Sequence, residues 1–228
     1  MRILFEKSKY EAIGALILFG LIVLMKPVLF SSLHGSGVWE WWLFHVGAFA
    51  VLPLLFMRFV LRSSVRQYHW KFLLKPKDWL LIVSAFTILV VAVAFAVLLL
   101  DWKSIFTVSA WTMGGWGTTL FVDLLLLPIA VLALEFFLRG FLLQTWIRFS
   151  GAAIAIVTVT LCALVYDMMF AGALDWKRGV WLVMFESVLG LTALRSNSFF
   201  ASAAVRWMFL VGIDMFVIAK AGGMWGGL

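Results

Sequence analysis

The sequence predicts an all-α, polytopic membrane protein, a transmembrane helical bundle of about seven spans. Of its 228 residues, 65% are hydrophobic and 13% are charged, and the mean hydropathy is +1.10. Soluble domains carry about 25% charged residues, so this composition excludes an ordinary soluble enzyme or binding module. Apolar runs long enough to cross a bilayer recur along the chain. Residues 1–228 are therefore expected to form a single transmembrane domain.

The N-terminal part, residues 1–117, is expected to hold three spans and an amphipathic linker. The second span opens with Trp39, Trp41 and Trp42, and indole rings favour the headgroup level of a bilayer. Pro27 predicts a kink in the first span, because proline removes a backbone donor. The expected spans are residues 12–30, 38–61 and 79–100, followed by the Trp-rich linker, residues 101–117.

A basic segment separates the second and third spans. Its first three arginines are spaced four residues apart and are predicted to form one stripe on a helical extension. Such a stripe beside a span is typical of contact with anionic lipid headgroups. Nucleic-acid binding is the alternative interpretation of this basic segment, but the loop is short for that role. The residues predicted to contact headgroups are Arg58, Arg62, Arg66, Lys71, Lys75 and Lys77.

The C-terminal part, residues 118–220, is expected to form a core of four spans with a polar interior. Each of these spans carries ionisable residues, although a charge at membrane depth costs at least about 2.5 to 3.5 kcal/mol on insertion scales. The expected spans are residues 118–146, 151–170, 179–194 and 199–219. The charged residues within them are Asp123, Glu135, Arg139, Asp167, Glu186, Arg206 and Asp214.

Glu135 and Arg139 stand four residues apart within one of the most apolar stretches of the chain. On a helix these positions share a face, so the two side chains are expected to pair. From the residues alone, the polar interior is compatible with a structural salt-bridge network, with a proton or ion path, or with a hydrolytic site.

The run from Glu135 to Leu143 resembles the first motif of the CPBP family, also called the Abi or CAAX prenyl-endopeptidase-like family. That motif is Glu-Glu-x-x-x-Arg followed by Gly and apolar residues. Residues 163–167 resemble the place where the family has Phe-x-x-x-His, and residues 190–201 resemble the stretch before its last motif. The resemblance covers residues 122–216, and it implies a CPBP-like helical core in the last four spans.

In the family, which comprises intramembrane glutamate proteases, the paired glutamates activate water. The histidines and an Asn or Asp polarise the scissile carbonyl or hold the oxyanion. The resemblance implies that only Glu135 and Arg139 survive as candidate catalytic residues. The degenerate motif positions are Leu134, Asp167, Arg206 and Leu210.

The resemblance therefore implies a catalytically degenerate relative, a pseudoenzyme. A lone carboxylate paired with a guanidinium is a poor general base. Asp167 and Arg206, at the two histidine positions, are expected to pair with each other. We expect a scaffold or accessory subunit of a membrane-protein complex, in contact with the lipid bilayer and with at least one membrane-protein partner.

Three other interpretations remain open. In the first, the protein is an active CPBP-type protease that uses Glu135. In the second, the buried charges belong to an ion- or proton-coupled transporter. Tyr166-Asp167 and Gly212-Ile213-Asp214 faintly resemble two motifs of intramembrane aspartyl proteases, in which carboxylates share a proton. The transport hypothesis lacks the paired halves with matching broken helices that many transporters show.

Charge distribution predicts the orientation of the chain. With seven spans and a cytoplasmic N-terminus, eleven of the 18 Lys and Arg residues lie inside and four lie outside, as the positive-inside rule requires. The C-terminus is then outside, and a bacterial cytoplasmic (inner) membrane is expected. His34, His45 and His69 lie outside the charged spans, and no metal, other cofactor or nucleic acid is expected; a packed or interfacial role is predicted for His45.

Overall fold

The computed structural model describes residues 2–31, 38–62, 75–99, 115–171 and 176–225. Side-chain surroundings are described for 6–25, 38–62, 75–95, 116–168 and 176–219. Within these ranges the chain is almost wholly helical and contains no strand. The expected all-α class is confirmed.

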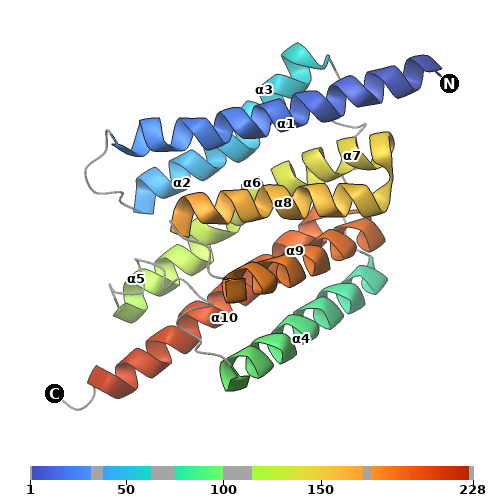
Figure 1. Ribbon diagram of the computed structural model, residues 1–228. Helices are drawn as coiled ribbons and strands as arrows, with labels where there is room; N and C mark the ends of the chain where they lie inside the picture. Colours follow the sequence, from blue (N-terminus) through green and yellow to red (C-terminus); the bar gives the residue numbers. More distant parts are fainter. Residues whose placement is uncertain (1, 32–37, 63–74, 100–114, 172–175, 226–228) are drawn as a thin grey trace.

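The helices follow one another in long, roughly aligned passes (Figure 1). Segments with π-helical hydrogen bonding, labelled η, interrupt two of these passes. The first half contains α1 (Arg2–Ser31), the pass formed by α2 (Val38–Val46), η1 (Gly47–Val51), α3 (Leu52–Leu55) and η2 (Phe56–Val60), and then α4 (Pro76–Leu99). The second half contains the pass formed by α5 (Gly115–Phe121), η6 (Val122–Leu126), α6 (Leu127–Glu135), η7 (Phe136–Leu142) and α7 (Leu143–Ser150), then α8 (Ala152–Ala171), α9 (Trp176–Ser196) and α10 (Phe199–Trp225).

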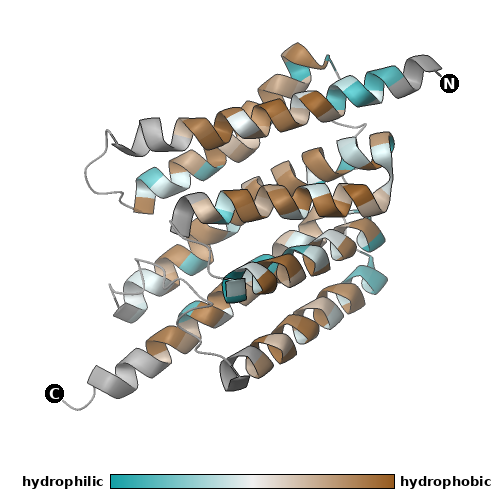
Figure 2. Ribbon diagram, in the orientation of Figure 1, coloured by the Kyte–Doolittle hydropathy of each residue, from teal (hydrophilic) through white to brown (hydrophobic). Residues whose placement is uncertain are grey.

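Six of the described helical passes are long and apolar enough to cross a membrane. They are Glu6–Met25, Val38–Val60, Pro76–Phe95, Trp116–Ser150, Trp176–Ser196 and Phe199–Ala219. Hydrophobic residues occupy most of their length, and hydrophilic residues gather near some ends, such as the beginnings of α1 and α4 (Figure 2). The shorter apolar stretch of α8, Ala152–Met168, falls outside this group. The seventh expected span therefore remains a prediction.

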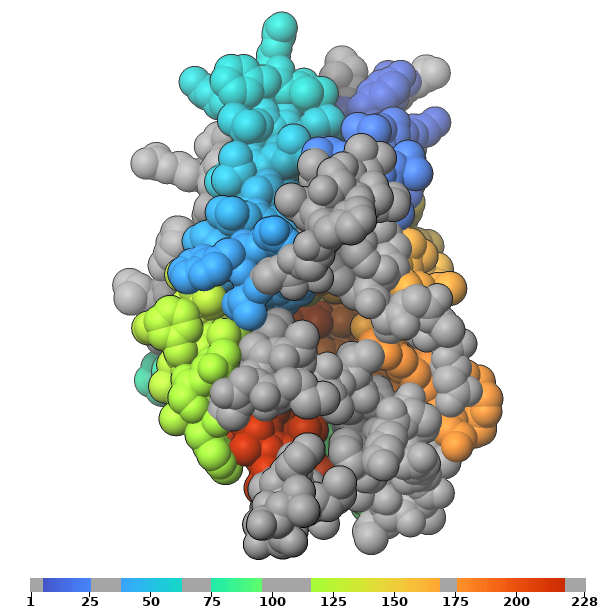
Figure 3. Space-filling model, turned by 90° about the vertical axis from the view of Figure 1, so that its left-hand side faces the viewer, coloured from blue at the N-terminus to red at the C-terminus, as the bar shows by residue number. Residues whose placement is uncertain are grey.

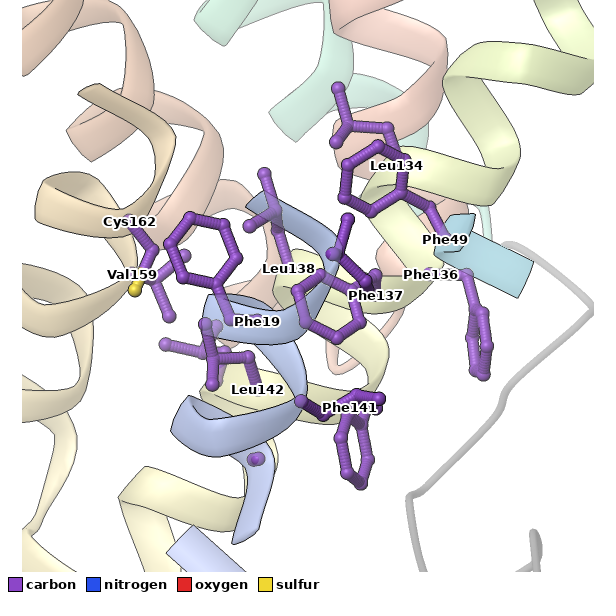
Figure 4. Close-up of a cluster of buried hydrophobic side chains, with 14 of the residues drawn as sticks. Phe19, Phe49, Leu134, Phe136, Phe137, Leu138, Phe141, Leu142, Val159 and Cys162 are labelled. Atoms are coloured by element: carbon purple, nitrogen blue, oxygen red, sulfur yellow. The ribbon is translucent and has the colours of Figure 1, made fainter. Parts of the chain in front are cut away.

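The helices pack around two main apolar clusters. In the larger one, the rings of Phe19 and Phe49 flank Phe137 of η7, with ring centroids 6.1 and 5.6 Å from its own. Figure 4 shows this cluster, with Cys162 and Val159 of α8 at its left edge, next to Phe19. In the smaller one, α4 packs against α9 and α10. The pass containing η7 thus lies between α1 and the pass from α2 to η2 on one side and the last three helices on the other, and α4 packs on α9 and α10.

Two of the π-helical segments have a cause in the sequence. Pro53 and Pro128 each lie two residues beyond a π segment, η1 and η6. A proline cannot donate to the carbonyl four residues earlier, and its ring clashes with that carbonyl. Those carbonyls belong to Phe49 and Leu124, which lie inside the two segments. The wider π turn accommodates each proline without ending the helix.

Trp207 supplies the hydrogen bond that Pro128 removes. In the five-residue register of η6, where the Leu127 N–H bonds to the Val122 carbonyl, the next donor would be residue 128. Proline has no N–H, so the Asp123 carbonyl would lose its partner within the helix. The indole Nε1 of Trp207, on α10, donates to this carbonyl at 2.8 Å. Side chains of neighbouring helices commonly satisfy backbone groups freed by proline in membrane helices.

The connection between α9 and α10 is a tight turn built from local hydrogen bonds. Asn197 adopts φ +54°, and the Asn197 and Ser198 N–H groups bond to the carbonyls of Leu194 and Ala193 at 3.3 and 3.2 Å. This pattern is the Schellman motif at a helix end. The Ser198 hydroxyl then accepts from the Phe200 N–H at 3.2 Å, as a helix N-cap does. Asn197 and Ser198 thus encode the turn of this hairpin.

The role of Trp207 can be tested with a double-mutant cycle on Pro128. Trp207→Phe keeps most of the ring and leaves the Asp123 carbonyl without its donor, so we expect a loss of about 1 to 3 kcal/mol in the free energy of unfolding. In a Pro128→Ala background, the alanine N–H can replace the indole, so Trp207→Phe should cost clearly less. Unfolding in detergent micelles measures both differences. Equal costs in the two backgrounds would contradict this account.

Candidate functional site

Two glutamates and two arginines form a buried ionic cluster between the central pass and the last two helices. Glu135 ends α6, Arg139 lies in η7, Glu186 lies near the middle of α9, and Arg206 lies in α10. Their exposed fractions are 0, 1, 3 and 8%, in the same order. We call these four residues the ionic quartet. Three separate helical passes therefore meet at one polar point.

Each charge in the quartet faces both opposite charges. Glu135 Oε1 accepts from Arg139 Nη1 at 3.0 Å and from Arg206 Nε at 2.5 Å. Glu186 Oε1 accepts from Arg206 Nη2 at 2.6 Å, and Glu186 Oε2 pairs with Arg139 Nη2. Arg139 Nη2 also lies 3.2 Å from the Glu186 carbonyl oxygen. The four side chains form a closed ring of four ion pairs.

The quartet is electrically balanced and surrounded by apolar groups. Two carboxylates offset two guanidiniums, and the Arg206 guanidinium carbon lies 5.2 Å from the centroid of the Phe185 ring. Buried charges are tolerated when paired and hydrogen-bonded in this way. Glu135 Oε2 and Arg139 Nε are buried without a hydrogen-bond partner among the described residues.

The expected pairing of Glu135 with Arg139 is confirmed, whereas the expected pairing of Asp167 with Arg206 is wrong. Arg206 pairs with Glu135 and Glu186 instead. Asp167 accepts two hydrogen bonds from Arg178, Nε to Oδ2 at 2.7 Å and Nη2 to Oδ1 at 2.8 Å. Asp167 lies near the end of α8 and Arg178 near the start of α9, so the pair spans the connection between these helices. Distance along the sequence did not reveal which partner each charge would reach.

The other motif positions lie in apolar or separate surroundings. Leu134 is a buried member of the larger apolar cluster, and Leu210 is partly buried against the small cluster around Leu127. Asp123 and Asp214 are buried in η6 and α10. Glu186 is thus the one charge, beyond the three at motif positions, that completes the quartet.

A packed or interfacial role was predicted for His45, and the structure shows the packed one, with the side chain buried. His45 also has a partner that the sequence did not reveal. Its Nδ1 lies 2.7 Å from the Trp41 carbonyl oxygen, which can only accept, so Nδ1 carries the proton. Its Nε2 then accepts from the Tyr166 hydroxyl. This hydrogen bond joins α2, which carries His45, to α8, which carries Tyr166.

The predicted basic stripe is interrupted. η2 ends at Val60, and Arg62 lies beyond it with φ +48°, so the expected helical extension carrying Arg58 and Arg62 on one face is wrong. Both side chains are exposed, as are Lys75 and Lys77 at the start of α4. Arg66 and Lys71 lie outside the described residues, as does most of the predicted linker, residues 101–117.

The described side chains include no group of three or more His, Cys, Asp or Glu placed to hold a metal ion. The quartet instead offers carboxylate oxygens already bound by guanidiniums. A general base needs an oxygen that can take a proton from water within hydrogen-bond reach. With Glu135 Oε1 and both oxygens of Glu186 bound by arginine, the geometry favours fixing helices over moving protons.

Removal of one arginine should be far more costly within the quartet than at the surface. Arg206→Gln leaves two buried carboxylates facing Arg139 alone, and breaking a buried pair in this way costs about 3 to 5 kcal/mol. Arg58→Gln is the control, since Arg58 is exposed at the end of η2, and little change is expected there. Unfolding in detergent measures both; similar losses for the two variants would show that the quartet is not a stabilising centre.

Comparisons of this chain with models of protein families, with curated proteins and with solved structures find no match.

Proposed function

We propose that this chain is an integral membrane scaffold or accessory subunit, a catalytically inactive relative of the CPBP family. One observation carries the proposal. Glu135, the surviving glutamate of the resembling motif, accepts from Arg139 and from Arg206, at 3.0 and 2.5 Å. Arg206 stands where the family has its second histidine. In this proposal Arg206, at a former catalytic position, thus compensates the charge of Glu135, the remaining candidate base.

The chemistry that the family needs is missing from the quartet. A carboxylate held between two guanidiniums has its negative charge compensated and is a poor general base. The quartet also lacks a neutral donor to polarise a carbonyl, since its donors are the two arginines already committed to carboxylates. These contacts support a role in holding three helical passes together.

A protein with such a core would act by binding other membrane components. Its outer surface is apolar over long helices, as contact with the lipid bilayer requires. Gly151, just before α8, and Ala152 and Ala153, in its first turn, are exposed, and small residues let a partner helix approach closely. These features support a membrane-protein partner.

The orientation proposed for the chain places the N-terminus in the cytoplasm and the C-terminus outside, in a bacterial cytoplasmic membrane. The excess of Lys and Arg on one side supports it. The two termini lie at opposite ends of the bundle (Figure 1), as an odd number of crossings requires. Figure 3 views the bundle from the left-hand side of Figure 1, where parts of α2, α5, α9 and α10 come together. This topology counts α8 as a crossing helix.

One observation favours a second candidate, an active intramembrane protease using Glu135. Oε2 of this residue is not bound by either arginine and has no hydrogen-bond partner among the described residues. It is the atom that a water-activating mechanism would use. Against this candidate, the Glu135 side chain is fully buried among the described residues, whereas a catalytic carboxylate must reach the scissile peptide bond.

A mild-detergent pull-down of the tagged chain, analysed by mass spectrometry, separates these functions. The test variant is Glu135→Gln/Arg139→Gln, which removes the candidate base and leaves the remaining pair, Glu186 and Arg206, electrically balanced. The matched control is Glu186→Gln/Arg206→Gln, which makes the same two kinds of change and keeps Glu135. For an accessory subunit, a stoichiometric membrane partner should be recovered with the wild type and with both variants.

The protease candidate predicts a different result. No stoichiometric partner would be recovered, and an uncleaved membrane substrate would accumulate only with the variant lacking Glu135. That outcome would overturn the accessory-subunit proposal. Comparison of the two variants separates loss of the carboxylate from loss of stability, because both retain one ion pair of the quartet.

A further inference from the structure

The ionic quartet consists of two ion pairs that lie in separate units of the chain. Glu135 and Arg139 are on consecutive turns of the pass from Gly115 to Ser150, with Arg139 Nη1 donating to Glu135 Oε1 at 3.0 Å. Glu186 and Arg206 lie on α9 and α10, with Arg206 Nη2 donating to Glu186 Oε1 at 2.6 Å. Each unit therefore contains one carboxylate and one guanidinium that already face each other.

Each of these pairs can form from local structure alone. Positions four residues apart on a helix are neighbours, so the first pair needs only its own helix. The second pair needs the α9–α10 hairpin, whose turn is encoded by Asn197 and Ser198 and their hydrogen bonds. The two helices pack directly through Phe185 and Phe209, whose ring centroids are 5.0 Å apart. Neither pair depends on the other unit.

The remaining contacts join the units. Arg206 Nε donates to Glu135 Oε1 at 2.5 Å, and Arg139 pairs with Glu186 Oε2. These contacts can exist only after the pass carrying Glu135 has met the α9–α10 hairpin. Each arginine thus has one carboxylate partner inside its own unit and one in the other unit.

We propose that each unit enters the membrane with its own charge pair already matched, and that the quartet forms when the two units meet. A lone charge within a membrane helix is costly, whereas a matched pair greatly reduces that cost. Helices that are stable in the bilayer then associate through packing and polar contacts. The pairing within units lets the chain carry four charges to membrane depth without exposing a single charge to lipid. This inference concerns assembly and does not depend on the function proposed above.

The quartet supplies its own matched set of variants. Four double substitutions each replace one glutamate and one arginine by glutamine, and each leaves one of the four ion pairs intact. Two of them, Glu135→Gln/Arg139→Gln and Glu186→Gln/Arg206→Gln, keep both units balanced at the quartet. The other two, Glu135→Gln/Arg206→Gln and Glu186→Gln/Arg139→Gln, leave a single charge in each unit. Asp123 and Asp214 are unchanged in all four, so they do not affect the comparison.

The experiment measures insertion of the full-length chain shortly after synthesis into membrane vesicles. Reporter cysteines before and after each unit, placed singly in a Cys162→Ala background, are labelled with a membrane-impermeant thiol reagent. The quantity compared is the fraction of chains with the wild-type labelling pattern. The two variants with balanced units should keep this pattern, and the two with split charges should lose it in a severalfold larger fraction of chains.

Unfolding of the correctly inserted fraction in detergent provides a separate measure of stability. A double variant that inserts normally and unfolds easily has lost stability without a fault in insertion. If the split-charge variants insert as well as the balanced ones, or better, the proposal is overturned, whatever their stability. If only the split-charge variants fail to insert, the pairing within units is what carries the charges into the membrane.

Discussion

The structure depends on the mutual compensation of four charges in an apolar bundle. Any one of Glu135, Arg139, Glu186 and Arg206 would be an uncompensated ion at a site with almost no solvent exposure. Each residue lies between two opposite charges, and the ring closes only when the central pass, α9 and α10 are all in position. Apolar packing has little directional preference, whereas this ring has one arrangement. It therefore fixes the relative positions of three helical passes more narrowly than packing alone.

A second constraint comes from proline in membrane helices. Where no water is available, every backbone group that proline frees needs another partner. At Pro53 and Pro128 the chain widens into π turns, and around η6 two indoles supply hydrogen bonds. Trp207 donates to the Asp123 carbonyl at 2.8 Å, and Trp42 donates to the Leu126 carbonyl at 3.0 Å. Trp207, on α10, replaces the donor that Pro128 lacks, whereas Trp42, on α2, bonds to a carbonyl that Pro128 does not affect. Together the two indoles tie this pass to two other helices. Segment η7 has no such proline, and it carries Arg139.

The quartet changes how the motif resemblance is interpreted. The charges at the motif positions are compensated, but by different partners from those that the resemblance predicted. Arg206 reaches across to Glu135 and Glu186, whereas Asp167 is held by Arg178 at the connection between α8 and α9. The Asp167 carboxylate, bound by two nitrogens of the Arg178 guanidinium, is also unlike a proton-sharing aspartate dyad. The pattern of contacts is that of a structural centre.

The sequence by itself determined the helical class, the membrane setting and the pairing of Glu135 with Arg139. Long apolar runs can only be helices in a bilayer, and residues four apart on a helix must be neighbours. It also placed most helix ends within a few residues, because Ser, Asn, Gly and Pro act locally at those ends. Only the tertiary structure showed that Glu186 and Arg206 join that pair. It also showed that Asp167 pairs with Arg178 and that the Tyr166 hydroxyl hydrogen-bonds to His45. Those choices depend on how helices face one another across the bundle, and spacing along a chain carries no information about the rotation of one helix relative to another.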